Sequence, residues 1–218
     1  MIPRFRVSPR IDVDLAEIRP PPMDVIHCEG GLSFNHDYVY IQGVTWRVFK
    51  KLYEVEGRAI AFLDSRAKNS EEFDELAEEL TAEELSVDDD WDKDYFDLAG
   101  FTIPDLGIAS VVCSLYAFKC YPITSCRGHP GERGARHPLV VFFCEPQVAP
   151  LLVGVAAGSH VGMENEYLDE ADGALIVYAQ SIVEMRNFAM DLSRASRIAT
   201  KLKCNLRKST GSEQPKLP

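Results

Sequence analysis

The sequence predicts an α+β fold, a two-layer sandwich in which a mixed sheet packs against helices. One observation is the uninterrupted apolar run at 139–144, which has the length and composition of a buried strand. Another is the seam of apolar residues from Met185 to Leu206, spaced alternately by three and four positions as in a long packed helix. A chain of 218 residues, 46% of them hydrophobic, can bury a core of this kind.

The predicted core spans residues 98–208. Its strands are expected at 121–124, 139–144, 161–167 and 174–179, and its helices at 105–119, 147–157 and 181–206. The last two strands flank an acidic, glycine-containing turn at 169–173, which is typical of a hairpin.

The residues before this core predict less regular structure. Residues 1–24 form a Pro- and Arg-rich extended arm, ordered only if it docks, and 25–85 form an N-terminal α/β part. Within that part we expect a strand at 38–41, a helix from its cap Thr45 to Gly57, and a further helix capped by Ser70. The tail 209–218 is expected to be disordered.

Charge is segregated along the chain. The formal net charge is −11, yet residues 71–97 hold fourteen acidic residues and one lysine, so the rest of the chain is nearly neutral. Within this stretch, 86–97 lacks apolar periodicity and is expected to be an acidic loop. This acidity argues against avid nucleic-acid binding, because affinity for nucleic acid comes mainly from basic contacts with phosphate.

Targeting features predict a soluble, cytoplasmic protein. The N-terminus lacks the apolar segment of a secretory signal, and no run approaches the roughly 20 apolar residues that a membrane span needs. The six cysteines are expected to be reduced thiols, because a chain of this length needs no disulfide staples.

The loop 124–137 holds the densest reactive chemistry of the chain. Its candidate catalytic side chains are Cys126, His129 and His137, since an Arg- and His-rich surround favours a thiolate and either histidine can act as a base. The same loop predicts an anion site, in which backbone N–H groups and basic side chains bind a phosphate or carboxylate. The predicted ligand-binding residues are Ser125, Arg127, Gly128, Arg133 and Arg136.

Two other interpretations of the loop remain open. Cys120, Cys126, His129 and His137 have ligand types suited to zinc, but their spacing, C-x5-C-x2-H-x7-H, matches no standard zinc module, so no metal is predicted. Alternatively, this is an ordinary surface loop with solvated charges and structural cysteines.

A resemblance to a known family covers about residues 105–180. The run TSCRG, from Thr124 to Gly128, leads into an apolar strand that ends in Cys144-Glu145-Pro146 and then into a helix. This pattern resembles the tRNA wybutosine-synthesising protein 3 family, although His129 stands where that family typically has Arg. The resemblance implies a methyltransferase-type site that uses S-adenosylmethionine, with Ser125 and Cys126 at the active site.

Two functions from different classes follow. In the first, the loop 124–137 binds or acts on a small anionic or nucleotide-like ligand, and a transferase is one form of this function. In the second, the protein is a non-catalytic accessory subunit of an assembly and docks through the acidic segment 71–97 and the C-terminal heptad helix. Beyond the resemblance, the sequence predicts no particular cofactor.

Replacing residues 86–97 by a Gly/Ser linker should leave the Tm within a few degrees. This segment has six aspartates in twelve residues and can bury little apolar surface. Thermal unfolding of the variant beside the wild type measures the effect. A Tm lower by about ten degrees would mean that the segment packs on the domain.

Overall fold

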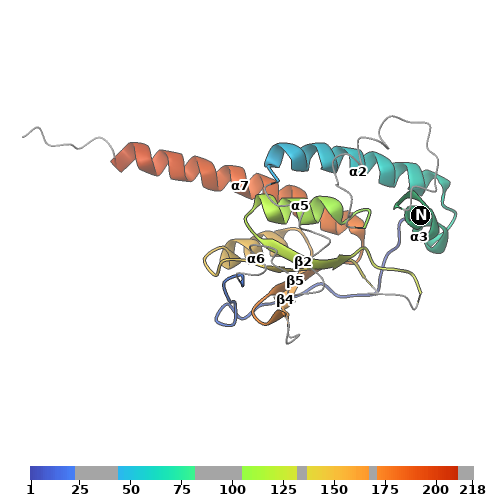
Figure 1. Ribbon diagram of the computed structural model, residues 1–218, viewed down its shortest axis with the longest axis horizontal. Coiled ribbons are helices and arrows are strands. Elements are labelled where there is room, and N and C mark those ends of the chain that lie inside the picture. The colour runs from blue at the N-terminus through green and yellow to red at the C-terminus, as the bar shows by residue number, and fades with distance from the viewer. Residues whose placement is uncertain (23–43, 82–104, 132–136, 167–170, 211–218) are drawn as a thin grey trace, which may run out of the picture.

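The computed structural model describes residues 1–22, 44–81, 105–131, 137–166 and 171–210, with side chains throughout these ranges except at 81 and 199–210. It confirms the α+β class, with a mixed sheet, helices against it and a long C-terminal helix (Figure 1). The predicted strand 38–41, the acidic loop 86–97 and the end of the tail lie outside the described residues.

The sheet has five strands in the order β1-β4-β5-β3-β2. The central strands pair antiparallel, and β1 adds to the edge in parallel with β4, which makes the sheet mixed as predicted. The adjacent strands β4 and β5 form the expected hairpin. The strand bounds are Ile11–Asp12 for β1, Tyr121–Cys126 for β2, Leu139–Phe143 for β3, Gly162–Asn165 for β4 and Leu175–Tyr178 for β5.

The helices gather on one face of the sheet. Helices α5, α6 and α7 form the layer next to the strands, α2 lies over α5, and α3 packs against α2 at one end (Figure 1). Their apolar side chains and those of the covered sheet face form the main core. The helix bounds are Trp46–Arg66 for α2, Ser70–Thr81 for α3, Ala109–Ala117 for α5, Ala149–Gly158 for α6 and Ile182–Thr210 for α7.

The N-terminal arm docks on the body along residues 1–22. Its first residues bind the end of α2, where the N–H of Ile2 donates to Asp64 at 2.8 Å. Further along, the Phe5 N–H donates to the carbonyl of Gln180 at 2.8 Å, and the Arg10 carbonyl accepts from Met163 at 2.9 Å. The sequence predicted that the arm would be ordered only if it docked, and these hydrogen bonds show that it does dock.

The first long helix does not end at Gly57 as the sequence predicted. Helix α2 continues through this glycine to Arg66, so the apolar segment 59–63 is its second half. A Cβ at residue 57 would lie 2.9 Å from Nη2 of Arg186, so the absence of a side chain here leaves room for the Arg186 guanidinium. Tertiary packing therefore outweighs the low helix propensity of glycine here.

The helix starts follow the capping rules, with one difference. The Thr45 hydroxyl accepts from the Val48 N–H at 3.4 Å, as expected. For α3 the capping side chain is Asn69, whose Oδ1 accepts from the Glu72 N–H at 2.8 Å, whereas Ser70 is the first helical residue.

A buried ion pair joins three helices at the centre of the helical layer. The Glu56 carboxylate of α2 is fully buried and accepts from Nε of Arg186 on α7 at 3.0 Å. Its other oxygen accepts from the backbone N–H groups of Gly107, at 2.9 Å, and Ser110, at 3.4 Å, at the start of α5. The Arg186 guanidinium also donates to the Tyr53 carbonyl and lies over the Tyr53 ring.

The apolar seam of α7 serves the core in its first half. Met185, Phe188 and Leu192 are all fully buried. Ala195, the next seam residue, is partly buried, and the seam residues at 199–206 lie beyond the described side chains. None of the described helices is long and apolar enough to cross a membrane.

Replacing Leu192 by Asp should cost about 4 kcal/mol or more of unfolding free energy, because the change leaves a cavity and buries a charge. Ile198→Asp is the matched control, since Ile198 lies on the same helix and is 60% exposed. Urea unfolding of both variants gives the two free energies. If Leu192→Asp stays as stable and soluble as the control, the seam serves a partner and not the core.

Candidate functional site

The loop with the predicted chemistry begins and ends on neighbouring strands. Cys126, the last residue of β2, pairs with Leu139, the first residue of β3, so the loop returns to its starting point. At its base the chain passes very close to itself: a Cβ at Gly128 would lie 2.8 Å from Cα of His137. Gly128 also has φ +77°, so glycine suits this position for both reasons.

Arg127 anchors the loop to α3 and to the start of α5. Its guanidinium is 3% exposed and contacts Asp74 at 2.8 Å and Asp105 at 3.3 Å. The backbone N–H of Arg127 also donates to Asp105 at 3.0 Å. The guanidinium therefore faces carboxylates of the protein itself, and this geometry does not support the predicted role of Arg127 in binding an anionic ligand.

His129 is held by the same helix. Its Nδ1 lies 3.0 Å and 3.1 Å from the two carboxylate oxygens of Asp74, and 3.8 Å from Oε1 of Glu78. A carboxylate in this position orients the imidazole ring. Asp74 thus fixes both Arg127 and His129.

Cys126 lies beside these groups. Its Sγ accepts from the Gly128 N–H at 3.3 Å, a contact that favours a sulfur carrying negative charge. The sulfur, a ring nitrogen of His129 and a carboxylate oxygen of Asp105 all lie within 4.8 Å of one another. The structure therefore brings Cys126 and His129 together, and it surrounds them with acids that the sequence reasoning had not placed there.

His137 occupies a different environment. Its ring packs edge-on against Tyr178, with the ring centroids 5.5 Å apart. Burial lowers the pKa of His137 below its usual value, and the Glu164 carboxylate partly opposes this shift. The ring therefore belongs to the sheet surface and not to the Cys126 cluster.

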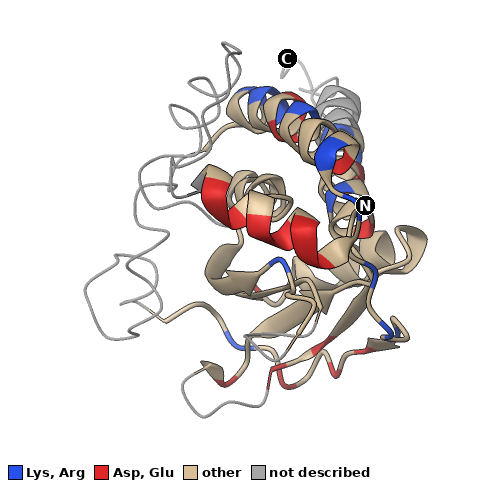
Figure 2. Cartoon of the chain, turned by 90° about the vertical axis from the view of Figure 1, so that its right-hand side faces the viewer, with Lys and Arg blue, Asp and Glu red and all other residues tan. Residues whose placement is uncertain are grey.

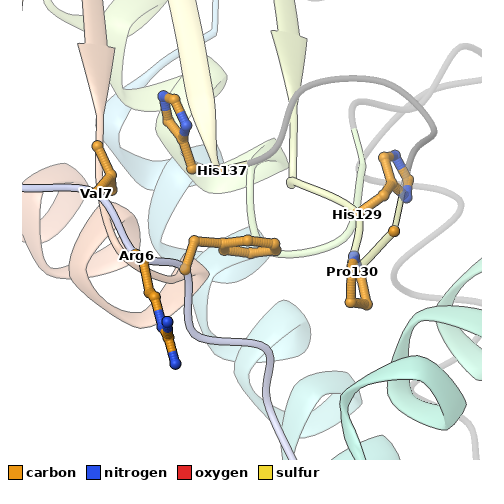
Figure 3. Close-up of a pocket in the computed structure, with 7 residues that line it drawn as sticks. Arg6, Val7, His129, Pro130 and His137 are labelled. Atoms are coloured by element: carbon orange, nitrogen blue, oxygen red, sulfur yellow. The ribbon is translucent and has the colours of Figure 1, made fainter.

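A hollow of about 500 Å³ separates the loop from the N-terminal arm. The arm lines it with residues 5–7, and the loop lines it with residues 129–131 and His137. Figure 3 shows that the side chains of Arg6 and His137 leave the chain in opposite directions, with His129 and Pro130 on the far side. The basic groups border this hollow without converging on one point.

The remaining predicted residues are placed as follows. Ser125 lies in β2 next to Cys126, whereas Arg133 and Arg136 fall outside the described residues. Cys120 is buried beside Cys144, and burial raises the pKa of both thiols. Among the described residues, the groups able to hold a metal ion include neither Cys120 nor His137, so the four-ligand zinc set is not assembled.

Asp74 and Asp105 are site residues that the sequence reasoning missed. Asp74 is one of several acids on α3, and Asp105 was assigned only to the start of a helix. Both are partners of the loop solely through tertiary contacts. No spacing in the sequence distinguishes them from the other acids.

The outer face of α3 is strongly acidic. Glu71, Glu75 and Glu78 are exposed and border a second hollow of about 260 Å³, which His129 and the next two loop residues close on the other side. Figure 2 views the molecule from the side on which α3 lies and shows acidic positions following one another along one helix there, whereas the helix above it mixes acidic and basic positions. His129 thus stands between an acidic hollow and the hollow beside the arm.

Comparison of this chain with protein-family models, with curated proteins and with solved structures gave no match. The resemblance to the wybutosine-synthesising protein 3 family and the methyltransferase activity that it implies therefore stay predictions.

Replacing Arg127 by Met should destabilise the fold by about 3 kcal/mol, because it leaves the carboxylates of Asp74 and Asp105 facing each other without their cation. The control is Arg194→Met, which breaks an exposed pair with Asp191 and should cost less than about 1 kcal/mol. Urea unfolding measures both. Equal, small losses would mean that the loop does not depend on this anchor.

Proposed function

We propose that the protein is an enzyme in which Cys126 is a thiol nucleophile and His129, oriented by Asp74, is its base. The loop 124–137 would act on a small anionic or nucleotide-like ligand, and group transfer is the reaction class that this chemistry serves. The single observation that supports the proposal most is the short contact between His129 Nδ1 and the Asp74 carboxylate, beside the Cys126 sulfur.

The chemistry follows the general logic of activated nucleophiles. A thiol attacks only after losing its proton, and a neighbouring imidazole held by a carboxylate can accept that proton. The Cys126 sulfur and a ring nitrogen of His129 lie within 4.8 Å of each other, inside the looser geometry expected of ligand-free sites. After attack, the imidazolium of His129 can return the proton to the leaving group.

The hollow beside the arm is the space that suits the ligand. It borders His129 directly, and Arg6 is an exposed cation at its edge. The hollow on the other side is bordered by four carboxylates of α3, which repel an anion. Of the two hollows that the described residues border, the one on the arm side therefore suits an anionic ligand better.

Iodoacetamide at neutral pH should alkylate Cys126 faster than any other cysteine. Cys113, Cys120 and Cys144 are buried with raised pKa values, which keeps them protonated and inaccessible. Peptide mass spectrometry over time gives the rate at each thiol. His129→Asn should slow alkylation of Cys126 by about tenfold, because the base is lost.

His160→Asn is the matched control, since His160 is exposed and has a left-handed backbone that asparagine tolerates. It should leave the rate at Cys126 unchanged. If His129→Asn leaves it unchanged too, or if Cys28 or Cys204 reacts first in the wild type, the nucleophile proposal fails.

The accessory-subunit function remains the second candidate, and the acidic face of α3 favours it. A row of exposed carboxylates on a docked helix suits a basic partner surface. In that case Arg127 and His129 only fasten the loop to α3, and removing the Cys126 thiol would leave partner binding intact.

A further inference from the structure

We propose that Asp105, Cys126 and His129 form an exchangeable zinc site, and that bound zinc masks the Cys126 thiol. The existence of the site is independent of the proposed function, whereas the masking effect rests on it. The three side chains come from the start of α5, the end of β2 and the loop, and their donor atoms already lie within 4.8 Å of one another.

The ligand types and their separation suit zinc. Zinc binds thiolate sulfur at about 2.3 Å and nitrogen or carboxylate oxygen at about 2.0–2.2 Å, so tetrahedral ligands stand about 3.3–3.8 Å apart. Closing the cluster around an ion therefore needs a contraction of at most about 1.5 Å. Rotation of the Cys126 and His129 side chains, which lie three residues apart on one turn, can supply it.

The turn itself is arranged as a sulfur ligand requires. Gly128 has φ +77°, and its N–H points at the Cys126 sulfur at 3.3 Å. A backbone N–H in this position stabilises a thiolate, the form that binds metal. The same turn brings the His129 ring to the side of the sulfur.

A second layer of contacts holds two of the ligands. Asp74 contacts Nδ1 of His129, as carboxylates commonly do behind metal-bound imidazoles. Asp105 accepts from the backbone N–H of Arg127, which fixes the direction of its carboxylate. The ligand side chains are therefore oriented before any ion arrives.

The local charge balance also favours a divalent cation. With Cys126 as a thiolate, the negative groups around His129 are Cys126, Asp74, Asp105 and the more exposed Glu78, against the single positive charge of Arg127. A dication offsets most of this excess negative charge. Without one, the thiolate adds a negative charge beside a carboxylate, which is unfavourable in a partly buried site.

A second group around the same imidazole is a weaker candidate. Asp74 and Glu78 also lie with His129 within 4.8 Å, but they offer oxygen ligands only. The Arg127 guanidinium stands 2.8 Å from Asp74 and 3.6 Å from Glu78, as it also stands 3.3 Å from Asp105, so this contact does not separate the two groups. A sulfur ligand also selects zinc over magnesium or calcium, which favours the group that contains Cys126.

Three protein ligands leave the fourth position of zinc to water, which makes the ion exchangeable instead of structural. While zinc is bound, the Cys126 sulfur donates its electron pair to the metal and does not attack a substrate. Removal of the ion would release the thiol. Zinc would in this way regulate the site of the proposed enzyme.

The experiment uses the full chain, freed of metal with a chelator and then titrated with Zn²⁺ in competition with a chromophoric chelator. One zinc per chain should bind with micromolar or tighter affinity. Cys126→Ser should weaken this binding by at least about tenfold. Glu78→Gln is the matched control and should leave it unchanged. Circular dichroism checks that both variants are folded.

Alkylation of Cys126 with and without saturating Zn²⁺ tests the masking, and bound zinc should slow it by about tenfold or more. Zinc affinity unchanged by Cys126→Ser, or lost in Glu78→Gln, would overturn the assignment of the site. Zinc binding at Cys126 with a thiol that stays unreactive in the metal-free protein would preserve the zinc site and refute the nucleophile. A reactive Cys126 in a protein that binds no zinc would refute the zinc site and preserve the nucleophile.

Discussion

Glu56 is fully buried, and a carboxylate at that depth is tolerated only because Arg186 and two backbone N–H groups surround it. The pair joins α2 to α7 and holds the first turn of α5 against both. Loss of either partner would leave an unpaired charge in the interior, which is far costlier than the pair is stabilising. Helices α2 and α7, which are distant in sequence, are therefore held in one relative position.

The turn at 105–108 connects this ion pair to the candidate site. Gly107, which donates to Glu56, lies two residues from Asp105, and a Cβ at Gly107 would lie 2.6 Å from Ile182 at the start of α7. The turn thus packs against α7 with no freedom to shift. Asp105 is held at its beginning and receives Arg127 of the loop. The geometry around Cys126 therefore depends on a buried ion pair in another layer of the fold.

The sequence predicted the elements better than the contacts between them. The buried strand at 139–143, the hairpin and the long last helix follow from local apolar patterns, which a chain carries within a few residues. The break expected at Gly57 was wrong because Arg186, far along the chain, fills the space above that glycine. The loop was likewise predicted as the site, but Asp74 and Asp105 reach it only through folding. Cys126 therefore lies among both basic and acidic groups, not among basic groups alone as expected. No local sequence pattern encodes this environment.

The mixed surround makes the two sides of the loop chemically unlike. His129, Pro130 and Gly131 form a thin wall between the hollow beside the arm and the acidic hollow of α3. Because Asp74 and Asp105 pair with Arg127, the groups that the described residues offer an incoming anion on the arm side are loop backbone and the exposed Arg6 of the arm. A cation approaching from the α3 side meets the carboxylates of Glu71, Glu75 and Glu78 instead. The same imidazole can therefore serve an anionic ligand on one side and a metal ion among its acidic neighbours, and Asp74, which holds its Nδ1, is common to both uses.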